Sequence, residues 1–188
     1  MKKLTSLFCF LALALLVTTP ALALTASESA RMKRDEFRVR LATIRDEKKK
    51  AIVERIDQNI AKINTNRTAI MLRHLTKIEE ILGRIETRTN SLASSGKDVT
   101  AVRTAITKAR EAIAAARTAV NAQAVKTHTI DITTETNLGS AVSAARTAFA
   151  KDLSAAHQTV VTARKAVRDV LKELAKVVGE KLTTTSED

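Results

Sequence analysis

The chain has 188 residues, carries 32 Lys and Arg against 20 Asp and Glu, and has a formal net charge of +12 at pH 7. It contains no Trp or Tyr and only four Phe, four Gly, one Pro and one Cys. A single Cys excludes an internal disulfide, and the scarcity of Pro, Gly and aromatic residues favours long helices over a mixed αβ core. We therefore predict an all-α chain held together by packing alone.

Residues 1–23 have the pattern of a cleaved secretory signal peptide. Lys2 and Lys3 give a positive start, an apolar run covers 7–17, and Ala21-Leu22-Ala23 supplies the small residues that signal peptidase requires. The apolar run is shorter than the roughly 20 residues of a membrane-spanning helix, which leaves an uncleaved anchor as the alternative. We predict an exported protein of the bacterial periplasm, cell surface or extracellular space.

Removal of the signal peptide would leave a basic chain without cysteine. Cys9 lies inside the apolar run, and the loss of Lys2 and Lys3 lowers the net charge from +12 to +10. That excess favours polyanionic partners such as nucleic acid, anionic lipid or acidic glycan. The alternative is a basic helix surface that serves only solubility.

The region 24–182 is predicted to be one elongated helical bundle that begins with a very long helix over 27–94. Thr25-Ala-Ser-Glu28 matches a capping box. Between Leu41 and Ile85 thirteen positions follow one another at steps of three or four, as one face of a helix requires, and ten of them are Leu or Ile; the exceptions are Lys48, Arg67 and His74. Asn64-Thr65-Asn66 are poor helix formers, but the apolar stripe keeps its phase across them, so we expect an unbroken helix.

Two further helices are predicted after a break at Ser94-Ser95-Gly96-Lys97. The second covers 98–126 with Asp98 as its cap, and the third covers 134–182. Between them "THTIDIT" alternates β-branched and polar residues, which indicates an extended connector. Residues 183–188 form a polar tail that we expect to be disordered. The fold class is thus a long antiparallel helical hairpin or three-helix bundle.

The unequal helix lengths predict an interaction surface. Folded back at Gly96, the second helix reaches only to about residue 65 of the first, which leaves 37–63 and 163–178 without cover inside the chain. We therefore expect a homo-oligomer, or a helical partner protein, at this end. A turn at 64–66 would instead allow a four-helix monomer. The predicted oligomer seam consists of Phe37, Leu41, Ile44, Ile52, Ile56, Ile60 and Ile63.

The same segment holds the densest positive block of the chain. Basic residues beside an apolar stripe suit a polyanion or an anionic membrane surface. The alternative is a solvated arm whose charges set the register with a second copy. The candidate polyanion contacts are Arg31, Lys33, Arg34, Arg38, Arg40, Arg45, Lys48, Lys49 and Lys50.

No pattern of catalytic or metal-binding residues occurs. His74, His128 and His157 are isolated from one another, and no phosphate-binding loop, nucleophile motif or converging carboxylate pair is present. We expect no enzyme activity, cofactor, metal or small-molecule substrate. His74 and Arg67 occupy positions of the apolar stripe. We expect His74 to be a packed or partly hydrated core residue, and Arg67 to pair with an acid or to mark the end of the packed bundle.

The run "INTNRTAIMLRHLTKIEEILGRIETRTNSLASSGKDVTAVRTAITKAREAI" resembles small exported helical proteins of small-genomed bacteria. In these a long helix, a Gly-Lys-Asp-Val turn, an Ala-rich helix, a Thr-rich connector and a second Ala-rich helix follow one another. The resemblance implies an all-helical fold and an exported address, and it assigns no site residues. Size, signal and charge are also similar to basic periplasmic holdase chaperones, but those trimerise through a β-rich body that this chain lacks.

These observations predict an exported, non-enzymatic structural or interaction protein of the cell envelope. It would associate with itself or with a partner through its apolar-striped helices. The alternatives are a periplasmic holdase and a protein that binds DNA or acidic glycan.

Overall fold

The computed structural model describes residues 19–179, and the side chains of 27–179. The elements are α1 (Thr19–Ala42), α2 (Glu47–Ser94), α3 (Thr100–Ala124), a single 3-10 turn η1 (Glu135–Asn137) and α4 (Leu138–Val178). Within 19–179 there is no strand, so the all-α prediction with one long helix is confirmed. Residues 1–18 of the predicted signal peptide and 180–188 of the C-terminal region lie outside the described residues.

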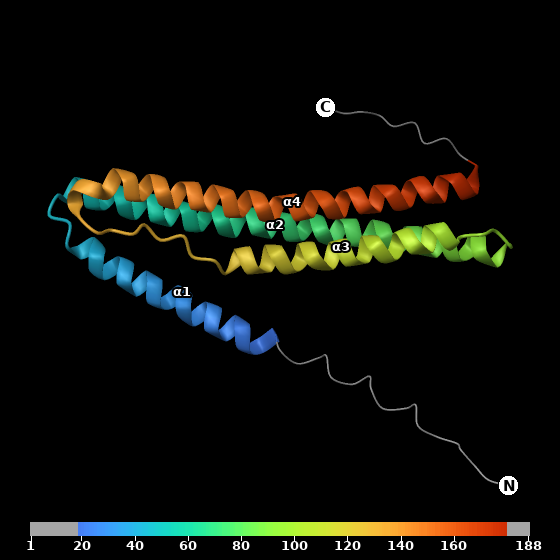
Figure 1. The fold of residues 1–188 in the computed structure, drawn as a ribbon, viewed down its shortest axis with the longest axis horizontal. Coiled ribbons are helices and arrows are strands. Elements are labelled where there is room, and N and C mark those ends of the chain that lie inside the picture. The colour runs from blue at the N-terminus through green and yellow to red at the C-terminus, as the bar shows by residue number, and fades with distance from the viewer. Residues whose placement is uncertain (1–18, 180–188) are drawn as a thin grey trace, which may run out of the picture.

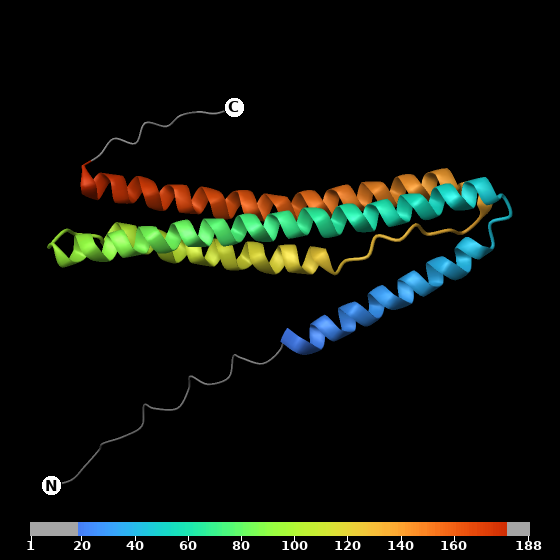
Figure 2. The same ribbon diagram turned by 180° about the vertical axis from the view of Figure 1, so that it is seen from behind.

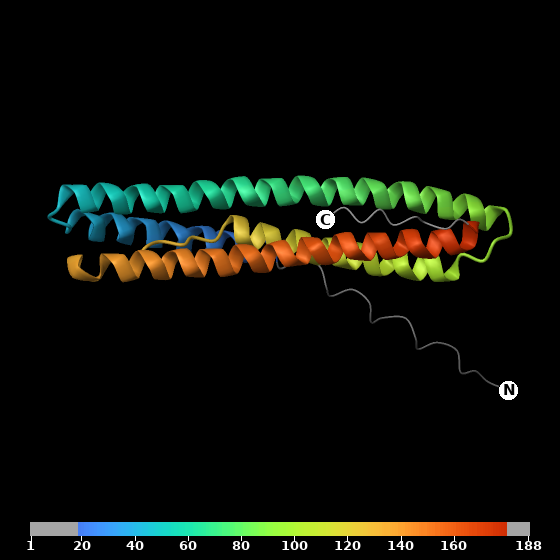
Figure 3. The same cartoon turned by 90° about the horizontal axis from the view of Figure 1, so that it is seen from above.

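The helices α2 and α4 pack side by side along most of their lengths, and α3 packs against the second half of both (Figure 1). The helices α2 and α4 start at the same end and run in the same direction, while α3 runs in the opposite one (Figure 1). Both α1 and α3 lie on one side of the α2–α4 pair, α1 along its first half and α3 along its second (Figure 3). Figure 2 shows that α1 diverges from the other helices toward its N-terminal end.

The predicted single helix over 27–94 is wrong, because the chain breaks at 43–46. Asp46 caps the start of α2, and its carboxylate accepts hydrogen bonds from the amides of Lys48 at 2.9 Å and Lys49 at 3.2 Å. Thr43 closes the end of α1, where its hydroxyl donates to the carbonyl of Arg40. The break lets α1 fold back beside α2 instead of extending it.

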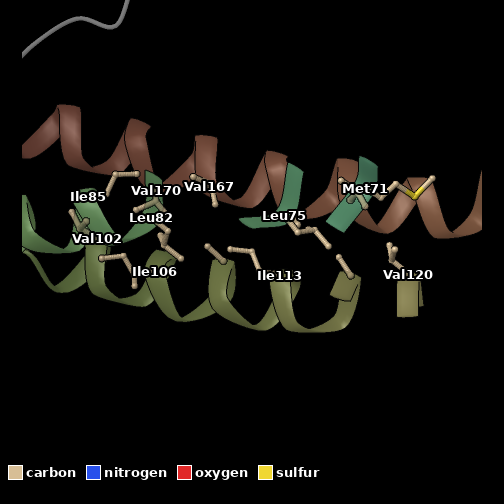
Figure 4. Packing of buried hydrophobic residues seen from close by; sticks show 14 of the residues in the cluster. Met71, Leu75, Leu82, Ile85, Val102, Ile106, Ile113, Val120, Val167 and Val170 are labelled. Carbon is tan, nitrogen blue, oxygen red and sulfur yellow. The ribbon is translucent and has the colours of Figure 1, made fainter. Parts of the chain in front are cut away.

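A larger apolar cluster, the distal core, joins the second half of α2 to α3 and α4 (Figure 4). Leu75, Val102 and Val170 are fully buried in it, and each comes from a different helix. Small residues on the stripes of α3 and α4 let these two helices approach closely, as at the buried Ala109, Ala116 and Ala163. The prediction that 163–178 lacks cover is therefore wrong at Ala163, Val167 and Val170.

A smaller cluster, the proximal core, fills the opposite end of the molecule. It is made of Phe37, Leu41, Ile44, Val53, Ile60, Ile130, Ile132, Leu138, Ala145 and Phe149. Ile130 and Ile132 come from the connector, which is extended as predicted and turns alternate side chains inward. Arg40 fixes it to α1 by donating to the Asp131 carboxylate at 2.8 Å and to the Ile132 carbonyl at 3.2 Å.

The two cores meet at a buried pair of side-chain amides. Asn64 Nδ2 donates to the carbonyl of Gln123 at 2.9 Å, and Gln123 Nε2 donates back to Asn64 Oδ1 at 3.0 Å. The helix α3 ends at Ala124, and Asn64 adds a side-chain donor to the Gln123 carbonyl, which also accepts from the amide of Lys126 at 3.1 Å. This contact confirms that the second helix reaches back to about residue 65, and α2 continues unbroken through Asn64, Thr65 and Asn66.

Candidate functional site: a basic groove between α2 and α4

The helix α2 has two apolar faces, and only one of them is used inside the chain. Val53, Met71 and Leu82 are buried, whereas the residue directly before each of them is an exposed isoleucine. Asn64, also buried, follows an isoleucine in the same way. The exposed fractions are 58% for Ile52, 45% for Ile63, 36% for Ile70 and 43% for Ile81.

These four isoleucines form one line along α2. At 100° per residue, spacings of 11, 7 and 11 place them within about 20° of one another around the helix. They extend over about 44 Å at a rise of 1.5 Å per residue. The core face carries polar residues at Asn64, Thr68 and Thr89, so polar side chains are buried while isoleucines face outward. This inversion marks the outward line as a candidate interaction surface.

A groove of about 730 Å³, the α2–α4 groove, lies beside the second half of this line. Its floor contains Met71, Val160 and Val167, which the distal core buries from below, and Ile70, Ile81 and Val161 border it. Residues of α1 and α3 do not contribute to its lining. The full lining is Arg67, Ile70, Met71, His74, Lys77, Ile78 and Ile81 of α2, and His157, Val160, Val161, Arg164, Val167, Arg168 and Leu171 of α4.

A second groove of about 720 Å³ continues along the same two helices toward their N-terminal ends. It contains Ile56, Ile60 and Ile63 of α2 opposite Val142 and Phe149 of α4. Arg146 is the single charged residue in its lining. The two grooves together follow α2 from 56 to 81, about 38 Å along the helix axis.

The charges around the α2–α4 groove are of one sign. Arg67 and Lys77 of α2, and Arg164 and Arg168 of α4, stand in its lining without a single Asp or Glu. His74 and His157 add two imidazoles. His74 is exposed, so the prediction that it is a packed or partly hydrated core residue is wrong. Arg67 is exposed one helical turn beyond Asn64, where α3 ends.

Two acidic residues of this part of α2 are engaged by α3 instead. Arg110 forms a two-pronged ion pair with Glu86, with Nε to Oε1 at 2.6 Å and Nη2 to Oε2 at 2.5 Å. Arg117 donates to Glu79 at 2.7 Å. The helix α2 therefore presents carboxylates to the arginines of α3 and basic side chains to the groove.

The predicted oligomer seam divides between the interior and the surface. Phe37, Leu41, Ile44 and Ile60 are buried in the proximal core, so the prediction that 37–63 lacks cover is wrong there. The cause is the break at 43–46, which brings α1 and the connector over the start of α2. Ile56 is half-buried against the same cluster, and only Ile52 and Ile63 stay exposed.

The predicted polyanion block is also divided by this break. Arg31, Arg34 and Arg38 fall within about 60° on one face of α1, and Lys33 lies on another. Arg45 and Lys48 stand at the junction with α2. Four of the nine basic residues pair with acids: Arg38 with Asp35, Arg40 with Glu36 and Asp131, Lys49 with Asp46 and Glu135, and Lys50 with Glu47. The block is therefore not one continuous basic stripe.

A polar cluster at the end of α3 was not expected from the sequence. The His128 side chain, 4% exposed, places Nε2 2.9 Å from Asp152 Oδ2, and Lys126 Nζ lies 2.6 Å from the same oxygen. Hydrogen bonds from Lys126 and His128 hold the pKa of the Asp152 carboxyl below its ordinary value of 3.8. The His128 ring also packs edge-on against Phe149, with centroids 5.2 Å apart. The cluster fastens the connector to α4.

Asp57 has the opposite electrostatic setting. Burial of this carboxyl beside α1 raises its pKa above 3.8, although the positive charge of Arg34 acts against the shift.

Among residues 27–179 no group of three His, Cys, Asp or Glu is arranged to hold a metal ion. None of the helices in the described part of the chain has the length and apolar content to span a membrane.

Comparisons with protein families, with curated proteins and with solved structures find no match to this chain. The resemblance to small exported helical proteins therefore stays a prediction.

Proposed function

We propose that this protein is an exported, non-enzymatic interaction protein that binds another protein along the α2–α4 groove. The observation that carries the proposal is the line of exposed isoleucines, Ile52, Ile63, Ile70 and Ile81. The packing of α2, α3 and α4 serves as the scaffold, and its own core already buries the other face of α2.

The cost of exposed apolar surface supports this function. Each buried Val, Leu or Ile side chain stabilises a folded protein by about 1.5 to 3 kcal/mol, and an exposed one contributes little of this. Single exposed apolar residues are common, but a line in register beside a groove is typical of a protein interface. A partner that covers Ile70, Ile81 and Val161 would be stabilised on binding by the burial of apolar surface that the chain itself leaves exposed.

Binding to a second copy is the alternative form of the same proposal. It is disfavoured by charge, because two identical α2–α4 grooves brought face to face would oppose Arg67, Arg164 and Arg168 of one copy to those of the other. A partner with a different charge pattern does not meet this repulsion.

Site-specific photo-crosslinking in the source cell tests the proposal. A photoreactive amino acid replaces Ile70 on α2 or Val161 on α4, and Val39, 69% exposed on α1, is the matched control position. We expect mass spectrometry to identify the same partner protein from positions 70 and 161, and not from position 39. The proposal is wrong if neither groove position yields an adduct, or if all three positions give the same products. An adduct to a second copy would establish the self-associating form instead.

A further inference from the structure

We infer that the occupant of the α2–α4 groove is an amphipathic helix with acidic residues on both flanks of its apolar stripe. The inference rests on the proposed function and specifies the partner's chemistry. It is carried by the juxtaposition of an apolar floor with basic side chains on both walls.

The floor fits the apolar stripe of a helix. Met71, Val160 and Val167 lie along it below the more exposed Ile70, Ile81 and Val161. The lining covers 67–81 on α2 and 157–171 on α4, about 21 Å or four helical turns on each helix. Two helices that run in the same direction and leave a straight groove between them present the surface on which a further helix packs in a bundle.

The basic residues on the two walls determine which residues should flank the apolar stripe of that helix. On α2 the wall carries Arg67, His74 and Lys77, and on α4 it carries His157, Arg164 and Arg168. A helix whose apolar stripe faces the floor turns its two neighbouring positions toward these two walls. Carboxylates at those positions would form ion pairs with Arg and Lys on both sides, whereas Lys or Arg there would be repelled.

Other occupants match the surface less well. The floor is recessed, so a flat membrane surface would not reach Met71, Val160 and Val167, each of which is less than 9% exposed. The second groove prolongs the apolar surface to about 38 Å along α2, which suits an elongated ligand rather than a compact one. A second copy would bring like charges together.

The test uses the full-length protein and two synthetic probe helices of 21 residues. Both carry Leu at the a and d positions of three heptads; one has Glu at e and g and the other has Lys. Fluorescence anisotropy should show at least ten-fold tighter binding of the Glu probe at low salt, and added salt should weaken it. Equal affinity for the two probes, or preference for the Lys probe, would overturn the inference.

Variants locate the binding site. Arg164→Glu together with Arg168→Glu should reverse the preference toward the Lys probe, while Arg164→Lys should keep it. Arg103→Glu, at an exposed position of α3 outside the groove, is the matched charge control and should change neither affinity. Circular dichroism checks that each variant stays helical, and Arg164→Gln serves if the double variant does not fold. Unchanged preference in the Arg164→Glu/Arg168→Glu double variant, or in Arg164→Gln where that variant replaces it, would contradict the inference.

Two competing occupants are tested in the same series. Displacement of the Glu probe by phosphatidylglycerol vesicles would assign the groove to a lipid surface, and a dimer that Ile70→Glu dissociates would assign it to a second copy. Either result would overturn the acidic-helix inference. Crosslinking from positions 70 and 161 distinguishes failure of the inference from failure of the proposed function. If both positions crosslink to the same partner but the two probes bind equally, the acidic-helix inference is wrong and the proposed function is supported.

Discussion

Two aspartates show how burial and pairing act in opposite directions on the same chemical group. In Asp57 burial dominates and raises the pKa of the carboxyl, so its charged form is less stable in the folded chain than in the unfolded one. In Asp152 the contacts from Lys126 and His128 dominate and lower the pKa. The charge of Asp152 therefore stabilises the fold at neutral pH, and the charge of Asp57 costs stability.

We predict opposite effects of neutralising these two aspartates at pH 7. Asp57→Asn should raise the melting temperature, and Asp152→Asn should lower the free energy of unfolding by about 1 to 2 kcal/mol, since it weakens hydrogen bonds to a charged group. The contribution of Asp152 is present above its unfolded pKa near 3.8 and is lost as the pH falls through its lower folded pKa. Wild type should therefore lose more stability than Asp152→Asn between pH 5 and 2.

Thermal unfolding followed by circular dichroism from pH 2 to 8 measures both effects. The exposed Glu80, replaced by Gln, is a matched control and should leave the melting temperature within about a degree at pH 7. A lower melting temperature for Asp57→Asn at pH 7 would show that attraction to Arg34 outweighs burial.

The buried amide of Asn64 is a second determinant at the scale of single residues. Asn64→Ala should lower the free energy of unfolding by about 1 to 3 kcal/mol, because it removes the buried acceptor of the Gln123 side-chain amide and one of the donors to the Gln123 carbonyl. Urea denaturation measures the difference, and the exposed Asn66→Ala is the control, for which we expect a change below about 0.5 kcal/mol. Similar losses in the two variants would contradict the assigned role.

At the scale of elements, Gly96 and Gly83 have opposite conformational roles. Gly96 ends the turn after α2 with φ of 81°, a conformation that costs a residue with a side chain about 1 kcal/mol. Gly83 lies inside α2, and an added Cβ would meet no atom within 4 Å. Glycine in a helix interior is less favourable than alanine.

We therefore predict that Gly96→Ala lowers the free energy of unfolding by about 1 kcal/mol, and that Gly83→Ala raises it by about 0.4 to 1 kcal/mol. Each variant serves as the control for the other, because both add the same methyl group. Chemical denaturation with matched slopes gives the two values. Changes of the same sign would contradict the contrast in backbone conformation.

Periodicity predicted the helices better than it predicted the buried face of α2. The turn at Gly96, the extended connector and the limit of the second helix near residue 65 all follow from local sequence. The break at 43–46 was missed because Leu41, Ile44 and Ile52 keep helical spacing across it. Asp46, a favoured N-cap residue, was the signal that could have revealed it.

The groove could not be read from the sequence for a related reason. Apolar pairs such as Ile52-Val53, Ile70-Met71 and Ile81-Leu82 give α2 a face wider than one partner covers. Which member of each pair is buried depends on where α3 and α4 lie. The apolar pattern of α2 alone does not give the positions of these neighbouring helices. The contact of His128 could not be predicted for the same reason, since its partner Asp152 is 24 residues away in the sequence.

At the scale of the whole molecule, the contacts of α2 with α3 differ in charge from its groove with α4. Ion pairs such as Arg110–Glu86 and Arg117–Glu79 lie between α2 and α3. The α2–α4 groove combines four basic side chains, Arg67, Lys77, Arg164 and Arg168, with the exposed Ile70 and Ile81, and no Asp or Glu lines it. The net charge of +12 is thus concentrated partly where an acidic partner would bind.

The division of the interior into a distal and a proximal core has a thermodynamic consequence. Among the hydrophobic residues of 27–179, Leu153 is the one partly buried side chain that packs against both cores, and the Asn64–Gln123 pair marks their boundary. Separate cores of one chain can open separately, the proximal one while the distal one stays closed. An occupant long enough to lie across both grooves would bind only when the two halves are closed together. Its binding energy would then couple them, so that the free chain behaves as two cooperative units and the complex as one.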